Sequence, residues 1–277
     1  MVLQLGQLFM RSLGELRYEP TAKRVRAVVD GTAVVDSRRA ILVWEPSRLV
    51  PSYAVPVDDV LVEMLPAPES ADGPTNPVRV EAGGPPVLDP RTPFAVHTCA
   101  GEPRTLRTPG GDRVGVGFQL ADPGVAGYVV LDFAGFDGWL EEEEPIVGHP
   151  RDPFKRIDVR RSSQLVRVEC GGWVLGESER PRMLFETYLP VRYYLPRDDI
   201  RTDLLIESET TSLCAYKGEA TYWSARIGDE TVADVAWTYR YPLTDAIEVR
   251  DMVAFFTERL DLFLDDELQP RPTTPWS

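Results

Sequence analysis

Lysine, histidine and cysteine are scarce in this chain of 277 residues. It has three lysines, two histidines and three cysteines, although arginine is plentiful. The two histidines, His97 and His149, stand far apart, and neither a Cys-x-x-Cys nor a His-Glu-x-x-His motif occurs. The sequence therefore predicts no structural zinc and no bound cofactor. Three widely spaced cysteines provide no disulfide framework and are typical of a reducing, cytoplasmic compartment.

Long apolar runs are also missing. A run such as Ala40–Trp44 is far too short to cross a bilayer, so we expect no membrane partner. The first twenty residues lack a basic head and an Ala-x-Ala end, so we expect no signal peptide. Their apolar positions are instead typical of a short helix, within an N-terminal helical segment over residues 1–16.

Positive charge is in deficit. The formal net charge is −14 and the pI is about 4.7, so the surface repels phosphate backbones and we expect no nucleic-acid partner. Hydrophobic residues make up 43 % and charged residues 27 % of the chain, which is ordinary for a folded soluble protein. The length suits one large domain or two small ones.

The chain contains an internal repeat. Residues 17–45 align with residues 158–186 at a constant offset of 141, which matches Gly31 with Gly172 and Glu45 with Glu186. After a slip of one residue, residues 52–65 align with residues 192–205. The ends of the copies, residues 136–144 and 260–267, are also alike. So many features in register indicate a duplication.

Each copy begins with the pattern of an antiparallel strand pair. Apolar and polar residues alternate on both sides of Asp30-Gly31 and of Gly171-Gly172, which are hairpin turn signals. The next apolar run is short and favours a buried strand, and a helical turn is expected over residues 199–205. We predict a mainly β (α+β) fold: two tandem repeats of a compact antiparallel β domain, each with one or two short helices.

The pattern divides the chain into segments. We expect a first repeat over residues 17–145, a second over 146–268 and a tail over 269–277. Residues 66–93 are rich in proline and glycine and favour a loop without regular structure. Residues 247–264 space their large apolar residues as a helix would, so we expect a helix there.

The second copy carries a distinctive motif. The stretch FETYLPVRYYLPRDDI over residues 185–200, followed by CAYKGEATYW over residues 214–223, resembles the hallmark of the bacterial and fungal family called domain of unknown function 427. The resemblance covers most of the chain as two tandem copies. That family is also filed under a nucleotidyltransferase label, but it implies no particular chemistry. The chain has neither a Walker-type nor a Gly-x-Gly-x-x-Gly phosphate loop in a strand–turn–helix setting.

This motif also contains the candidate site. Glu186, Lys217 and Tyr194 are the candidate catalytic groups, because a carboxylate, an ammonium and a phenol can exchange protons. The first copy lacks the lysine and the Tyr-Trp pair and is expected to hold a degenerate site. The candidate ligand-binding residues are Arg192, Tyr193, Tyr222, Trp223 and Cys214.

Two functional interpretations stay open beside a purely structural one, in which Glu186 pairs with Arg192 and the rings pack the core. The first is a small-molecule-binding pocket in the second repeat without catalysis. The alternative is a transferase or hydrolase with a Glu/Lys/Tyr acid–base site, which requires a raised pKa at Glu186 or a lowered one at Lys217. Lys217 is expected at the pocket rim, where its removal costs little stability. The ligand is not identified, and a homodimer stays open.

Overall fold

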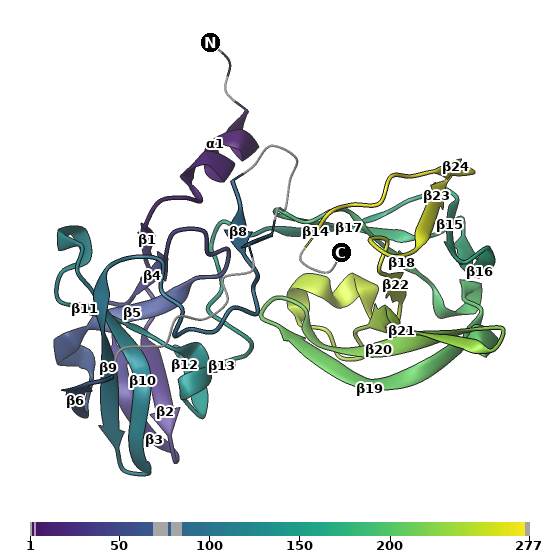
Figure 1. Ribbon diagram of the computed structural model, residues 1–277. Helices are drawn as coiled ribbons and strands as arrows, with labels where there is room; N and C mark the ends of the chain where they lie inside the picture. Colours follow the sequence, from purple (N-terminus) through teal and green to yellow (C-terminus); the bar gives the residue numbers. More distant parts are fainter. Residues whose placement is uncertain (1, 3, 69–76, 79–84, 275–277) are drawn as a thin grey trace. The chain divides into compact units, whose positions relative to one another are not determined.

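The computed structural model describes residues 2, 4–68, 77–78 and 85–274. The chain divides into two compact units, Met1–Asp152 and Pro153–Ser277, which are described separately (Figure 1). A short helix, α1 (Leu5–Ser12), precedes the strands of the first unit, as its apolar spacing predicts. No helix within the described ranges is both long and apolar enough to cross a membrane.

Each unit contains a seven-stranded and a four-stranded sheet, and the named strands pair antiparallel. In spatial order, the larger sheet of the first unit is β1 (Arg17–Pro20), β4 (Ile41–Trp44), β5 (Ser52–Pro56), β11 (Tyr128–Leu131), β10 (Gly111–Leu120), β9 (Gly101–Thr108) and β6 (Glu63–Pro66). Its smaller sheet is β13 (Glu144–Ile146), β12 (Gly138–Glu141), β2 (Val25–Val29) and β3 (Thr32–Ser37).

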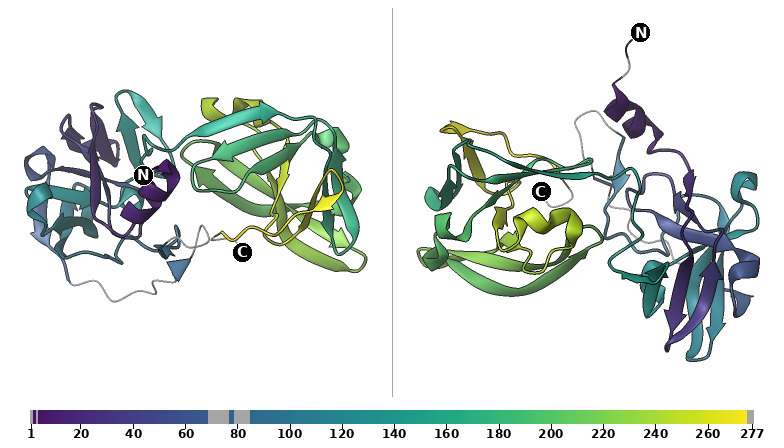
Figure 2. Two further views of the ribbon diagram at one scale, coloured as in Figure 1. Left: turned by 90° about the horizontal axis from the view of Figure 1, so that it is seen from above. Right: turned by 180° about the vertical axis from the view of Figure 1, so that it is seen from behind.

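The second unit repeats this order strand for strand. Figure 2 shows the ribbon of each unit from two further sides. Its larger sheet is β14 (Ile157–Arg161), β17 (Arg182–Glu186), β18 (Arg192–Leu195), β22 (Val253–Phe255), β21 (Glu230–Thr238), β20 (Gly218–Ile227) and β19 (Leu205–Cys214). Its smaller sheet is β16 (Trp173–Ser178), β15 (Val166–Cys170), β23 (Asp261–Leu264) and β24 (Glu267–Leu268). The mainly β, two-repeat architecture expected from the sequence is confirmed.

The pairing register preserves the duplication in detail. Arg17 pairs with Trp44 in the first unit and Asp158 with Phe185 in the second, which is the offset of 141. The β2–β3 and β15–β16 hairpins each carry an irregularity at the same place, after Ala27 and after Val168. Such irregularities redirect a strand and are structural features rather than accidents.

Two apolar clusters form in each unit, one on each face of the larger sheet. In the second unit one cluster includes Val166 and Val168 of the smaller sheet, together with Leu195 and Trp223. The other, on the opposite face, includes Leu184 of β17, Tyr194 of β18 and Trp237 of β21. It also includes residues of the 3-10 segment η6 (Thr244–Val249), which packs against β14 and lies between the β14–β17 and β19–β20 ends of the sheet in Figure 1. The candidate site lies on this second face.

The predicted helix over residues 247–264 is wrong. The stretch contains the end of η6, the strand β22 and the strand β23. Asp251 has a φ of 58°, which breaks the chain direction, and β22 then hydrogen-bonds between β18 and β21. Sheet pairing supplies each backbone group with a partner, so tertiary context outweighs the helical spacing of the apolar residues.

The short turns and loops agree only in part with the expectations from the sequence. Residues 199–205 do contain helical turns, η4 (Arg197–Asp199) and η5 (Thr202–Leu204). The acidic run after residue 140 forms the turn of the β12–β13 hairpin. The proline- and glycine-rich loop over residues 66–93 lies partly outside the described residues. Its described part contains one short strand pair, β7 (Pro77–Val78) and β8 (Val87–Leu88). The first repeat also has the 3-10 turns η1 (Val57–Asp59), η2 (Pro123–Val125) and η3 (Phe133–Gly135).

Candidate functional site

Glu186 is the last residue of β17 and is only 8 % exposed. Alternate residues of a strand share a face, so it lies on the same face as the buried Leu184. Two cations contact its carboxylate: Nζ of Lys217 donates to Oε2, and Nζ of Lys155 lies 3.0 Å from Oε1. The carboxylate is thus held between two ammonium groups inside the second repeat.

The pKa values of Glu186 and Lys217 are shifted in the directions that favour the charged form of each group. Burial acts to raise the pKa of Glu186, but the charges of Lys217 and Lys155 outweigh burial and lower that pKa to about 2. Burial likewise acts to lower the pKa of Lys217, and the facing carboxylate raises it well above its usual range. At neutral pH Glu186 and Lys217 therefore both carry full charges.

A tight turn places Lys217 in the interior. The turn joins β19 to β20, and Gly218 follows it with a φ of +90°, a conformation that side chains beyond glycine rarely adopt. The expected rim position is wrong, because Lys217 is only 8 % exposed and forms a buried ion pair. The positive φ of Gly218 permits this tight turn, from which the ammonium of Lys217 reaches the interior.

Tyr194 lies on the neighbouring strand β18 and is buried. Its hydroxyl accepts a hydrogen bond of 3.1 Å from Nε1 of Trp237, and burial raises its pKa to about 12. Tyr239 is also buried, and burial raises its pKa well above the usual range. These phenols are therefore neutral at physiological pH.

The structure separates the remaining candidates. Arg192 does not pair with Glu186, because both of its terminal nitrogens donate to Glu258, at 2.8 and 2.5 Å. Thr274 of the tail also donates to Glu258, over 2.6 Å. This second buried ion pair connects β18 to the segment after β22, and it was not visible in the sequence because Glu258 belongs to the stretch expected to be helical.

The aromatic candidates divide between the two faces of the sheet. Trp223 belongs to the core between the two sheets, and Tyr193 packs against the same cluster. Tyr222 packs on the opposite face, and its hydroxyl lies 2.8 Å from Oγ of Ser212. Trp223 and Tyr222 thus lie on opposite faces, as strand alternation predicts. Cys214, half-buried, ends β19.

The first repeat has its own version of the carboxylate cluster. Glu45, at the position equivalent to Glu186, is only 3 % exposed. Its carboxylate lies 2.9 Å from Nδ1 of His97, accepts the backbone N–H of Thr98 at 2.8 Å and lies 3.6 Å from Sγ of Cys99. Burial acts to raise the pKa of Glu45, but the hydrogen bonds from His97 and Thr98 lower it.

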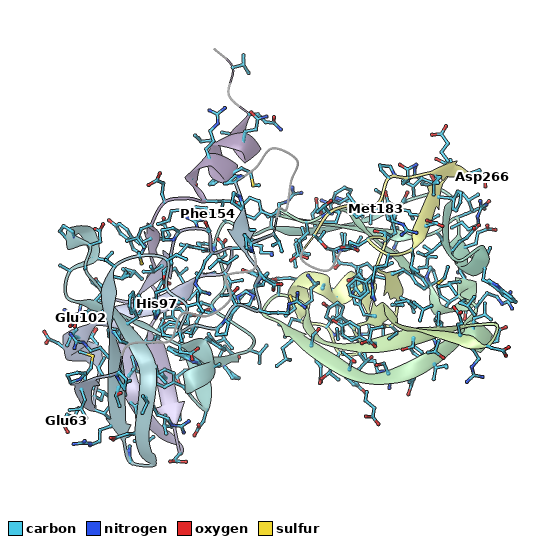
Figure 3. The ribbon with its side chains drawn as sticks, viewed as in Figure 1. Glu63, His97, Glu102, Phe154, Met183 and Asp266 are labelled. Atoms are coloured by element: carbon cyan, nitrogen blue, oxygen red, sulfur yellow. The ribbon has the colours of Figure 1, made fainter. Side chains whose placement is uncertain are left out.

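From the sequence alone, no site was assigned to His97 or Cys99, and this cluster was missed. The available signal was the alignment itself, which matches Glu45 to Glu186 and places residues 97–101 near residues 212–218. His97, labelled in Figure 3, is stacked on Phe118 with ring centroids 3.5 Å apart. Burial and the neighbouring Glu45 raise the pKa of Cys99 to about 12, so the thiol is a poor nucleophile. Among the described residues no cluster of three His, Cys, Asp or Glu side chains suits a metal ion.

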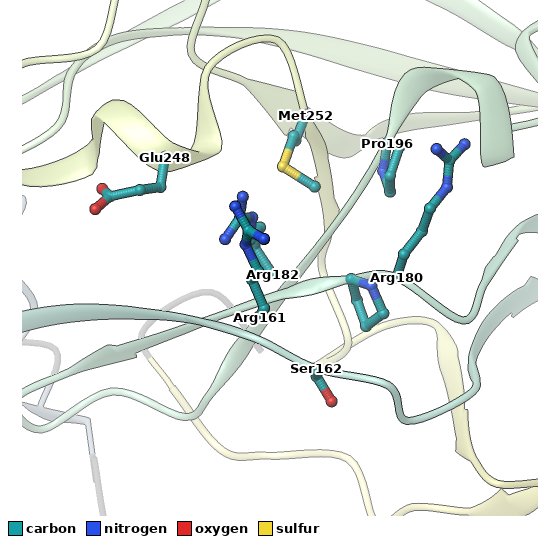
Figure 4. Close-up of a pocket in the computed structure, with 8 residues that line it drawn as sticks. Arg161, Ser162, Arg180, Arg182, Pro196, Glu248 and Met252 are labelled. Atoms are coloured by element: carbon teal, nitrogen blue, oxygen red, sulfur yellow. The ribbon is translucent and has the colours of Figure 1, made fainter.

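A pocket of about 400 Å³ opens in the second repeat beside η6 (Figure 4). None of the predicted site residues lines it. Its lining consists of Arg161, Ser162, Arg180, Pro181, Arg182, Pro196, Glu248 and Met252. Arg182 and Glu186 belong to the same strand and, being four residues apart, lie on the same face. The pocket and the Glu186 cluster therefore share β17.

Comparison with known proteins identifies the family. No curated protein matches the chain in a sequence search. A family model described as Domain of unknown function (DUF427), which carries a nucleotidyltransferase label, matches residues 17–75 and 158–266. The two matched segments cover more than half of the chain and fall one in each repeat. The chain therefore belongs to the DUF427 family, of which it contains two tandem copies.

Proposed function

We propose that this protein binds a small molecule in its second repeat and does not perform acid–base catalysis at Glu186 and Lys217. The observation that carries the proposal is the pocket of about 400 Å³ beside η6. Ligand pockets in proteins are concave, combine apolar walls with a few polar groups and commonly have volumes of about 300–1,000 Å³. This pocket lies within that range of volume, but its lining is richer in charge: Met252 and two prolines stand beside three arginines, a glutamate and a serine.

The protonation states favour binding over catalysis. A general base works best when its pKa lies near the operating pH, and Glu186, with a pKa of about 2, is far too acidic. The ammonium of Lys217 has a raised pKa and stays protonated, and the pKa of Tyr194, at about 12, keeps its phenol neutral. The shifts are the reverse of those that an acid–base enzyme needs at these residues.

The buried charges therefore have a structural role in this proposal. Glu186 connects the end of β17 to Lys217, before β20, and to Lys155, before β14. β17 also carries Arg182 of the pocket, so the ion cluster fixes the strand that provides one pocket wall. Polar groups on rigid strands with fixed neighbours are what a preorganised binding site requires.

Thermal melting with a metabolite library tests the proposal. The library spans anionic, cationic and neutral compounds and is applied to the wild type, to Met252→Trp and to Leu213→Trp. Met252 lines the pocket, and the larger ring occupies part of it. Leu213 is 58 % exposed and does not line the pocket, so its variant is the control.

We expect at least one compound to raise the melting temperature of the wild type and of Leu213→Trp but not of Met252→Trp. Binding to the native state alone stabilises it by mass action, so the shift grows with ligand concentration. A library without any stabilising compound, or a shift that persists in Met252→Trp, contradicts the proposal.

A further inference from the structure

We infer that the pocket beside η6 takes a phosphate monoester, held by the paired guanidinium groups of Arg161 and Arg182. The inference rests on the proposed function and identifies its ligand class. Arg161 and Arg182 are direct partners in the register of β14 and β17. Figure 4 shows both side chains projecting toward the segment that carries Glu248 and Met252.

The two arginines lie directly opposite each other on adjacent strands. Like charges directly opposite each other on neighbouring strands destabilise a sheet. In the described part of the chain, neither guanidinium has a hydrogen-bond or ion-pair partner, although the protein has 44 acidic residues and only 30 basic ones. Their neighbour Arg180, by contrast, donates to both oxygens of Asp199 at 3.1 and 2.8 Å. Among the described residues, Arg161 and Arg182 thus have no direct partner in a pocket whose lining also contains the carboxylate of Glu248.

The first repeat shows that the fold does not need this pair. Its equivalent register position joins Pro20 to Ile41, which are 141 residues before Arg161 and Arg182. The same β pairing therefore forms there with one proline and one apolar side chain. Because the arginines add repulsion without adding a partner, a ligand that neutralises them explains their presence better than folding does.

Charge and shape select the ligand class. A guanidinium presents a planar fork of N–H donors that matches the oxygens of a phosphate, and two forks can bind several of them. A phosphate monoester carries about −1.5 to −2 charges at pH 7 and has enough oxygens to engage both guanidinium groups, whereas a single carboxylate pairs with one. Met252 and the prolines provide apolar walls for the organic part, and Glu248 can accept a hydrogen bond from a ligand donor.

Calorimetric titration of the full chain at pH 7.5 tests the inference with two probes of nearly the same shape. Phenyl phosphate is a dianion under these conditions and phenyl sulfate is a monoanion. The variants are Arg161→Gln and Arg182→Gln. The control is Arg160→Gln, because Arg160 is the exposed neighbour on the other face of β14 and lies 2.5 Å from Asp158.

We expect phenyl phosphate to bind the wild type and Arg160→Gln equally, and each pocket variant at least about tenfold more weakly. Phenyl sulfate should bind the wild type at least about tenfold more weakly than phenyl phosphate. Without ligand, Arg182→Gln should melt at the same or a higher temperature than the wild type, because it removes a like-charge pair. That result separates a binding role from a structural one.

Two outcomes overturn the inference: phenyl phosphate does not bind, or both pocket variants bind it as tightly as the wild type. If either occurs while a library compound still depends on Met252, only the ligand class is refuted. If the library also gives no compound that depends on Met252, the proposed function is refuted with it.

Discussion

Glu186→Gln should strongly destabilise the second repeat. The substitution keeps the shape of the side chain but removes the charge that faces Lys217 and Lys155. Glutamine can still accept one hydrogen bond, but it cannot balance two ammonium groups. Lys217 is only 8 % exposed, so burial then lowers its pKa and disfavours its charged form.

The pKa shift of Glu186 gives the size of the expected loss in folding stability. A carboxyl pKa of about 2 in the folded protein, against an ordinary 4.5, corresponds to about 3 kcal/mol of stability at neutral pH. Breaking a buried ion pair by removing one partner costs about 3–5 kcal/mol, which agrees. We therefore expect Glu186→Gln to lower the free energy of unfolding of this unit by about 3 kcal/mol.

The same shift predicts an acid dependence. Because folding lowers the pKa of Glu186, its contribution is fully present above pH 4.5 and is lost as the pH falls toward 2. The wild type should lose this stability between those values, and Glu186→Gln should lose less over the same interval.

Urea unfolding of the full chain at pH 7 and at several values between 5 and 2.5 measures both effects. The chain has two compact units, so the transition of the second repeat must be resolved before a free energy is assigned. Glu219→Gln is the control, since Glu219 is an exposed residue of β20. A Glu186→Gln protein within about 0.5 kcal/mol of the wild type at pH 7, or with the same acid dependence, refutes the reasoning.

Three further predictions concern Arg192, Cys99 and Gly101. Arg192→Met should cost about 3–5 kcal/mol in urea unfolding, because it leaves the buried Glu258 without its cation, and a loss below about 1 kcal/mol contradicts this. Iodoacetamide at pH 8 should modify Cys99 at least about tenfold more slowly in the native protein than in urea, because burial and Glu45 raise the thiol pKa to about 12. Peptide mass spectrometry measures the two rates, and equal rates contradict the prediction. Gly101→Ala should lower the melting temperature of the first repeat and cost about 1–3 kcal/mol of stability, because the added Cβ would lie 2.6 Å from Gln119 O. Gly138→Ala is the control and should be nearly neutral, because a Cβ added there has no atom within 4 Å.

The candidate site was only partly predictable. Glu186 and Lys217 were named because both stand in the family motif, and the structure brings them together. Lys155 and Glu258 were not named, since each meets its partner only after distant strands pair. The arginines of the pocket were missed for the same reason: Arg161 and Arg182 are 21 positions apart, and only the β14–β17 register makes them neighbours.

The sequence by itself determined the duplication, the hairpins and the mainly β class. Those features depend on local chemistry: alternating polarity, and turn residues such as Asp30 and Gly31 that adopt positive φ. Tertiary structure decided the rest. A segment with the apolar spacing of a helix forms strand β22, because it pairs between β18 and β21. The tertiary structure also determined which charges are buried. Apolar spacing is a property of one segment, whereas the partner of a strand edge or of a buried charge depends on the whole fold.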